Sequence, residues 1–176
     1  KKNKADIGIA FDGDGDRIGV LDSDGNFISG DKLLLVYAMD ILKTKPNSKI
    51  IADVKASNII FETINNLGGE AIMCKTGHSF IKAKMKETKA LLAGEMSGHI
   101  FIADDYYGFD DALYASVRLL NIISQGFNIK KFLDKFKNLY STPEIKVFCE
   151  DNIKFKVIDQ IKKIAHKKYK EVIVAL

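Results

Sequence analysis

The chain has 176 residues, of which 47% are hydrophobic and 28% are charged, a balance typical of a folded globular protein. The net charge of +4 comes almost entirely from lysines spread along the chain, without an arginine-rich patch or a nucleic-acid-binding motif, so we expect no nucleic-acid partner. No apolar run approaches the ~18 residues of a membrane span, and no secretion signal opens the chain, which predicts a cytoplasmic protein without a membrane partner.

The first motif along the chain is a loop at residues 11–17, with the sequence FDGDGDR. Residues at alternate positions of an extended segment project to one side, so Asp12, Asp14 and Asp16 can converge while the intervening glycines let the backbone curl. Magnesium commonly takes a few carboxylates and leaves positions for water and a phosphate oxygen. The loop therefore predicts a magnesium site, with Arg17 beside it as a clamp for phosphate.

Two other interpretations of this loop are an exposed turn and a calcium-binding loop. Apolar stretches at 5–11 and 18–21 flank the aspartates and predict two strands joined by a sharp loop, which argues against a merely solvated turn. A calcium-binding loop needs Gly at its sixth position and Glu at its twelfth, where this chain has Arg17 and Ser23.

Strands and helices are predicted to alternate between residues 30 and 139. We expect helices at 33–42, 57–67, 79–88, 110–125 and 129–139, and strands at 49–54, 70–74, 90–93 and 100–103. This order predicts an α/β layered domain with a mixed, largely parallel sheet flanked by helices, together with partial neighbouring domains.

Three short loops, 53–55, 75–78 and 94–99, follow predicted strands and should share one edge of the sheet, where α/β domains bind ligands. In the third loop Glu95, Ser97 and His99 stand at alternate positions. Glu95 can accept hydrogen bonds from sugar hydroxyls, Ser97 can donate or accept, and His99 can move a proton near neutral pH. Taken alone, a loop of this composition is more often a solvated strand connection than a site, and the flanking apolar strands and the two companion loops favour the site.

The other two loops each contain one candidate side chain. Lys55 follows an apolar strand, where partial burial would suit it to proton transfer, but its position alone favours an ordinary exposed lysine. His78 precedes a helix whose N-terminal N–H groups favour anions. Capping of that helix by Ser79, with His78 only packed, is equally compatible with the sequence.

The pattern changes past residue 140. A strand at 145–149, a lysine-rich helix at 152–169 and an apolar stretch at 171–176 are predicted, too few elements to bury a core, and this predicts the start of a truncated domain. The two cysteines, Cys74 and Cys149, fall within predicted strands without short metal-ligand spacing. They predict buried free thiols in a reducing compartment.

Taken together, four motifs resemble the α-D-phosphohexomutase family in order and approximate spacing: DGDGDR at 12–17, DVK at 53–55, KTGH at 75–78 and GEMSGH at 94–99. The resemblance implies four domains around a central cleft. It assigns residues 1–26 to the end of domain 2, residues 27–139 to domain 3 and residues 140–176 to the start of a truncated domain 4.

The resemblance also implies a reaction and roles for side chains. It implies transfer of phosphate between a phosphoserine and a hexose 1-phosphate or 6-phosphate, through a 1,6-bisphosphate. Family members bind Mg²⁺ through the aspartates that match Asp12, Asp14 and Asp16. The implied catalytic residues are Lys55, His99 and Arg17, and the implied substrate-binding residues are Arg17, Lys55, His78, Glu95, Met96, Ser97, Gly98 and His99. Phosphoglucosamine mutases usually have Gln at the position of Met96, so glucose and mannose phosphates are favoured.

Two motifs of the family are missing from this chain. No serine is followed by His, as in the family's Ser-His-Asn phosphoserine loop, and no arginine follows Arg118 to form the phosphate site of domain 4. We therefore expect a fragment of a longer chain. Its partners, domain 1 and most of domain 4 of the parent chain, are missing, so the fragment alone should not catalyse the reaction. A non-catalytic module that binds a metal or a sugar phosphate is the alternative.

Overall fold

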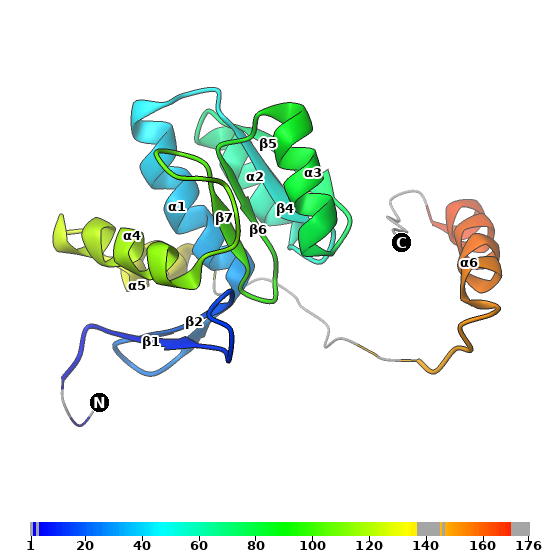
Figure 1. Cartoon of the computed structure of the whole chain (residues 1–176), viewed down its shortest axis with the longest axis horizontal. Coiled ribbons are helices and arrows are strands. Elements are labelled where there is room, and N and C mark those ends of the chain that lie inside the picture. Colours follow the sequence, from blue (N-terminus) through cyan, green and yellow to red (C-terminus); the bar gives the residue numbers. More distant parts are fainter. Residues whose placement is uncertain (1, 3, 137–144, 146, 170–176) are drawn as a thin grey trace. The chain divides into compact units, whose positions relative to one another are not determined.

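The computed structural model describes residues 2, 4–136, 145 and 147–169, which fall into two units, Lys1–Lys135 and Phe136–Leu176 (Figure 1). Among the described residues, none of the helices combines the length and the apolar character that a membrane crossing requires. The elements of the first unit, in chain order, are β1 (Ile7–Phe11), β2 (Ile18–Asp22), β3 (Phe27–Ile28), α1 (Gly30–Thr44), β4 (Lys49–Asp53), α2 (Asn58–Asn66), β5 (Glu70–Cys74), α3 (His78–Thr88), β6 (Leu92–Gly94), β7 (Ile100–Ile102), α4 (Ala112–Ser124) and α5 (Ile129–Leu133).

The N-terminal strands form a small antiparallel sheet in the order β1-β2-β3. The register pairs Ile7 with Asp22 and Phe11 with Ile18, so the aspartate loop is the connection of a hairpin, as predicted. β3 was not predicted, because two residues are too few to show an alternating pattern.

The second sheet has the order β5-β4-β6-β7. β4 pairs in parallel with β5 and β6, and β7 is antiparallel to β6, which confirms the predicted mixed, largely parallel sheet. The predicted helix at 129–139 is shorter than expected: α5 is followed by a 3-10 helix at Asp134–Phe136, and residues 137–139 lie outside the described part.

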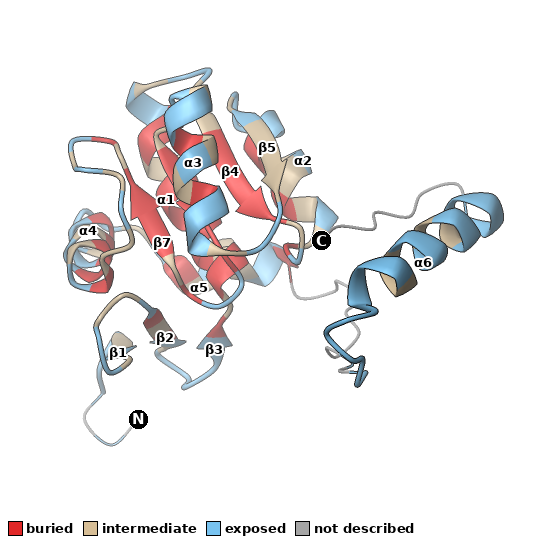
Figure 2. Ribbon diagram, turned by 45° about the vertical axis from the view of Figure 1, so that its right-hand side comes forward, coloured by how far each residue is buried: buried red, intermediate tan, exposed pale blue. Residues whose placement is uncertain are grey.

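Helices cover both faces of this sheet (Figure 1). α1 and α2 contact each other on one face, and α3 packs on the other. Side-chain alternation along β6 explains this arrangement, because Ala93 joins a buried cluster with Ile81 and Met85 of α3, whereas Gly94 faces Leu34 of α1. α1, β4 and β7 are largely buried in this core (Figure 2).

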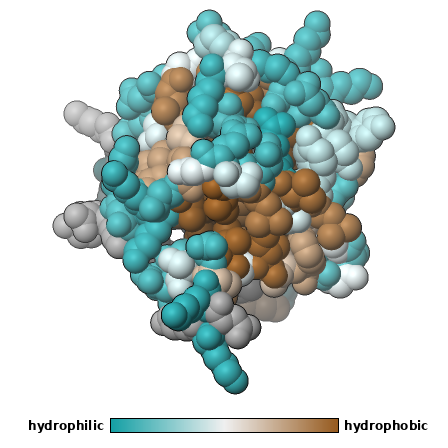
Figure 3. Space-filling view, turned by 90° about the vertical axis from the view of Figure 1, so that its left-hand side faces the viewer, coloured by the Kyte–Doolittle hydropathy of each residue, from teal (hydrophilic) through white to brown (hydrophobic). Residues whose placement is uncertain are grey.

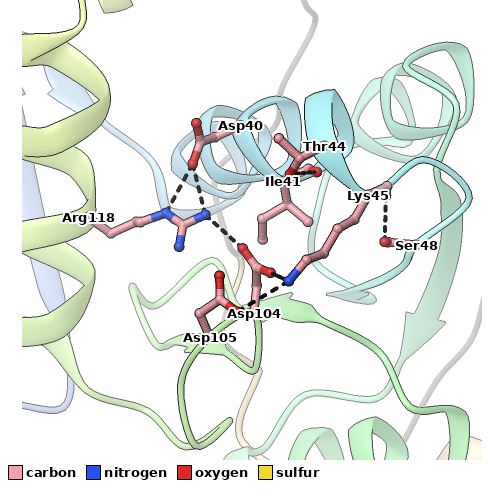
Figure 4. Close-up of polar contacts among 8 residues, drawn as sticks. All are labelled: Asp40, Ile41, Thr44, Lys45, Ser48, Asp104, Asp105 and Arg118. Atoms are coloured by element: carbon pink, nitrogen blue, oxygen red, sulfur yellow. Dashed lines mark hydrogen bonds and ion pairs between the residues drawn. The ribbon is translucent and has the colours of Figure 1, made fainter.

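A network of charged side chains joins α4 to α1 (Figure 4). The guanidinium of Arg118 in α4 donates to Asp40 of α1 at 3.0 Å and to Asp104, in the loop after β7, at 2.7 Å. Lys45 ion-pairs with the same Asp104 and, at 3.4 Å, with Asp105. The Asp104 side chain is only 2% exposed, so its charge depends on these two cations.

The outer face of α4 is apolar. Leu113, Val117 and Leu120 lie about one turn apart and are all exposed. Hydrophobic side chains gather on the side of the molecule that carries α4 (Figure 3). Apolar patches of this kind are typical of surfaces that contact another protein segment.

The second unit contains α6 (Lys154–Lys168), close to the helix predicted at 152–169. The strand predicted at 145–149 is wrong: residues 145 and 147–149 have no strand structure, and residue 146 lies outside the described part. A strand needs a partner, and the described residues of this unit contain none. Cys74 is half-buried in β5, whereas Cys149 is exposed rather than buried. The apolar stretch at 171–176 lies outside the described residues.

Candidate functional site

The aspartate loop between β1 and β2 is closed by Arg17. Its backbone N–H donates to Asp12 Oδ1 at 3.1 Å and its side-chain Nε–H donates to Asp12 Oδ2 at 2.5 Å. The loop brings one carboxylate oxygen from each of Asp12, Asp14 and Asp16 within 4.8 Å of one another. The three side chains therefore converge as the alternating spacing predicts.

The electrostatics of this loop suit a bound cation. Burial opposes ionisation of Asp12, but the hydrogen bonds from Arg17 outweigh it and lower the pKa of this carboxyl well below its usual range. Burial raises the pKa of Asp16, and the charges of Asp14 and Asp12 add to the rise although His99 opposes it. Asp16 Oδ1 is buried and makes no hydrogen bond within the described part of the chain. Arg17 Nε lies 3.8 Å from this oxygen, too far for a hydrogen bond, and a divalent cation would coordinate the oxygen directly.

The loop at 94–99 connects β6 to β7, and its Glu95 is only 3% exposed. Glu95 accepts hydrogen bonds from the Gly77 N–H at 2.6 Å and from the Ser97 hydroxyl at 3.4 Å. The bond from Gly77 links the loop 75–78 to the loop 94–99, and the bond from Ser97 lies within the loop 94–99. A carboxylate has about four acceptor positions, so Glu95 keeps the capacity to accept from a ligand hydroxyl.

Asp53, the last residue of β4, was not predicted as a site residue. It is 1% exposed and accepts from the Thr76 hydroxyl at 3.1 Å and from the Met96 N–H at 3.4 Å. Burial raises the pKa of Asp53. This side chain joins all three loops at the sheet edge, and a lone aspartate at the end of an otherwise apolar strand was the signal for it.

Lys55, His78, Met96 and Ser97 are all exposed at this edge. α3 begins at His78, with Gly77 rather than Ser79 next to its first turn, so capping by Ser79 is not what positions the histidine. The rings of His78 and His99 lie with their centroids 6.3 Å apart and their planes 28° apart. The structure therefore brings these two predicted histidines together.

The aspartate loop and the loop at 94–99 are joined through their backbones. The Ile18 N–H donates to the Gly98 carbonyl at 3.1 Å, and Arg17 forms an antiparallel bridge with His99. Nδ1 of His99 lies 3.7 Å from Asp16 Oδ2. The start of α1 is equally close to this loop, because a Cβ atom on Gly30 would lie 2.2 Å from the Glu95 carbonyl oxygen. The predicted metal and sugar loops are thus adjacent.

Gly98→Ala should disrupt this joint. Gly98 has φ +97°, and an added Cβ atom would lie 2.6 Å from the Ile18 carbonyl oxygen, so we expect this chain to lose ~1–3 kcal/mol of unfolding free energy in urea titrations. Gly13→Ala is the matched control in the aspartate loop, where nothing lies within 4 Å of the added carbon. Equal stability of the two variants would contradict the described joint.

Asp110 and Lys82 are a second pair that the sequence did not reveal. Asp110 Oδ2 lies 3.3 Å from Nδ1 of His99, and Asp110 Oδ1 ion-pairs with Lys82 Nζ at 2.9 Å. Asp110 falls at the predicted start of a helix, and no spacing rule relates it to His99. An isolated bridge between Phe101 and Asp110 brings it there.

Comparisons with known proteins identify relatives of this chain. Residues 29–140 match the family described as phosphoglucomutase/phosphomannomutase, alpha/beta/alpha domain III. A phosphomannomutase/phosphoglucomutase of Pseudomonas syringae pv. tomato is 48% identical over 166 residues, 94% of this chain and 36% of that protein. A phosphoglucomutase of Neisseria gonorrhoeae is 51% identical over 147 residues, 84% of this chain and 32% of that protein.

A solved structure shows the same fold. The crystal structure of a phosphoglucomutase/phosphomannomutase family protein from Burkholderia thailandensis aligns with a TM-score of 0.82 and 45% identity, over 90% of this chain and 33% of that chain. The chain spans about a third of the length of these relatives. It follows from the matched domain and these identities that the chain belongs to the phosphoglucomutase/phosphomannomutase family.

Proposed function

We propose that this chain supplies the metal loop and the sugar loop of a magnesium-dependent phosphohexomutase. The whole enzyme would interconvert hexose 1-phosphate and hexose 6-phosphate, of mannose or glucose, through a phosphoserine and a 1,6-bisphosphate. The observation that carries the proposal is the backbone joint between the two loops, the Ile18–Gly98 hydrogen bond and the Arg17–His99 bridge. It places a cluster of carboxylates beside hydrogen-bonding groups suited to a sugar phosphate. The names of the relatives support the same reaction.

Asp12, Asp14 and Asp16 would hold the magnesium ion, and the unsatisfied Asp16 oxygen is the observation that fits it. When bound, the ion would neutralise charge on the transferring phosphoryl group. The side chain of Arg17 is half-exposed, and its Nε–H donates a hydrogen bond to Asp12. The terminal N–H groups of the Arg17 guanidinium would bind phosphate.

The remaining roles follow from position at the sheet edge. Lys55 and His99 would share the roles of general acid and general base. His99 lies beside the carboxylate cluster, and Lys55 lies at the sheet edge after β4. Contacts to the substrate would come from the exposed or loop-forming residues His78, Glu95, Met96, Ser97 and Gly98. We assign residues 1–26, 27–139 and 140–176 to parts of domains 2, 3 and 4 of a cytoplasmic parent protein whose domains 1 and 4 complete the cleft.

The full-length protein that contains this chain tests the proposal. We expect it to convert mannose 1-phosphate or glucose 1-phosphate to the 6-phosphate, to lose activity in EDTA and to regain it with Mg²⁺. Asp14→Asn should lower turnover by about 100-fold or more, because the metal contributes several kcal/mol of transition-state stabilisation. Asp24→Asn, in the turn after β2, is the control.

Two results with the full-length protein would refute the proposed function. A full-length protein that binds hexose phosphates without interconverting them, or whose turnover is unchanged by Asp14→Asn, would refute the proposal. Binding without turnover would support the non-catalytic module instead.

A further inference from the structure

The Nδ1 nitrogen of His99 faces two carboxylates. It lies 3.3 Å from Asp110 Oδ2 and 3.7 Å from Asp16 Oδ2. Nδ1 is buried, and it makes no hydrogen bond of regular geometry within the described part of the chain. Both neighbouring groups are acceptors, so a lone pair on Nδ1 would be repelled and a proton there would be attracted.

Asp110 is the more firmly held of these two carboxylates. Its side chain is 9% exposed, whereas that of Asp16 is 33% exposed. Lys82 of α3 contacts the other oxygen of Asp110 at 2.9 Å. Burial opposes ionisation of Asp110, but the hydrogen bond from Lys82 outweighs it and lowers the pKa of Asp110. Asp110 is therefore a fixed negative charge beside Nδ1.

The plane of the His99 ring is also restrained. The ring stacks with the rings of His78 and Phe101, with a centroid distance of 6.3 Å to each and interplanar angles of 28° and 27°. Stacking limits the tilt of the ring, and the carboxylate of Asp110 favours one orientation of the ring edge.

We propose that Asp110, anchored by Lys82, is a positioning residue that fixes His99 in the Nδ1–H tautomer and leaves Nε2 to accept a proton from a sugar hydroxyl. The inference rests on the proposed function, in which His99 moves that proton. The proton would pass from the hydroxyl oxygen to Nε2, and that oxygen would bond to phosphorus as the P–O bond of the phosphoserine breaks. The bonding electron pair would stay on the serine oxygen, which would take a proton from the general acid of the proposed function. Asp110 would then face the positive charge of the imidazolium.

The tautomer can be measured in this chain without any activity. Long-range ¹H–¹⁵N correlation spectra of the ¹⁵N-labelled chain, at a pH where its histidines are neutral, distinguish protonated from unprotonated ring nitrogens. The signals of His99 are assigned by their loss in His99→Gln. We expect a protonated Nδ1 and an unprotonated Nε2 for His99, and a shift toward the Nε2–H tautomer in Asp110→Ala.

Lys82 provides the second variant, since its half-exposed side chain can be replaced with little risk to the fold. Lys82→Met should shift the tautomer in the same direction, and Lys82→Arg should restore it. Lys84→Met is the matched control, because Lys84 on the same helix makes an ion pair of the same length, 2.9 Å, with the exposed Glu87. In the full-length protein Lys82→Met should lower kcat about 10–100-fold with little change in KM, by analogy with the loss of groups that hydrogen-bond to metal-ligating side chains.

Three results would overturn the inference. They are an Nε2–H tautomer in the wild-type chain, a tautomer unchanged by both Asp110→Ala and Lys82→Met, and equal kcat for Lys82→Met and Lys84→Met in an active full-length protein. A cation bound among Asp16, His99 and Asp110 would require an unprotonated Nδ1, so it would give an Nε2–H tautomer in the wild-type chain and would also overturn the inference. A full-length protein without mutase activity refutes the proposed function alone, while the tautomer still decides the role of Asp110.

Discussion

In the full-length protein, His99→Ala should lower kcat by ~10²–10⁴-fold, the usual contribution of a general acid or base. The stability of the fold should change little, because the residue ends a loop and Asp110 keeps its ion pair with Lys82 when the imidazole is removed. We expect a loss of about 1 kcal/mol or less in urea unfolding, near the average for single substitutions. Steady-state kinetics and unfolding of the same preparations separate the two effects.

Two further variants complete this experiment. Lys55→Ala should also lower kcat within the ~10²–10⁴-fold range if Lys55 shares the acid and base work. His166→Ala, on the exposed surface of α6, controls for the loss of any imidazole. Near-normal turnover in both His99→Ala and Lys55→Ala would remove the two residues from the mechanism and leave the metal and Arg17 to account for it.

Arg118→Met should lower the unfolding free energy of this chain by about 3–5 kcal/mol, because it removes one partner of a buried ion pair. Asp104 is almost fully buried and would keep only Lys45, and Asp40 would lose its hydrogen bonds from the guanidinium. Urea unfolding followed by circular dichroism measures the loss. Lys84→Met, which breaks an exposed ion pair, should cost about 0.5 kcal/mol or less.

The pH dependence of stability gives a second readout for the same network. Burial opposes ionisation of Asp104, but hydrogen bonds from Lys45 and Arg118 outweigh it and lower the pKa of Asp104. A lowered carboxyl pKa contributes stability above the unfolded value of about 3.9, and that contribution is lost as the pH falls through the folded value. The wild-type chain should therefore lose more stability than Arg118→Met on acidification below about pH 4. Parallel curves for the two proteins would contradict the described network.

The sequence predicted the layered fold because its strands and helices are long enough to show their periods. It missed β3, which has two residues, and it wrongly predicted a strand at 145–149, where an apolar segment has no strand beside it in the described residues. Periodicity measures a segment's own pattern, whereas strand formation also needs a partner.

Two parts of the candidate site were predictable: the aspartate cluster, whose residues are close in sequence, and the position of the loops 53–55, 75–78 and 94–99 at one sheet edge, which follows from the parallel strands. Asp12, Asp14 and Asp16 converge because they share one loop, and the alternating spacing reveals this directly. The contact between Asp110 and His99, and the joining of three loops by Asp53, depend on how separate segments pack. No local pattern contains that information.

The joint between the aspartate loop and the loop at 94–99 has a consequence for how a ligand is accommodated. It is made by backbone atoms of Ile18 and Gly98, so most side-chain substitutions in either loop leave the separation of the two loops unchanged. A sugar phosphate that contacts both loops must therefore match a preset span. We expect that any closing motion around such a ligand occurs in other parts of the parent protein, and that the two loops move as one rigid piece.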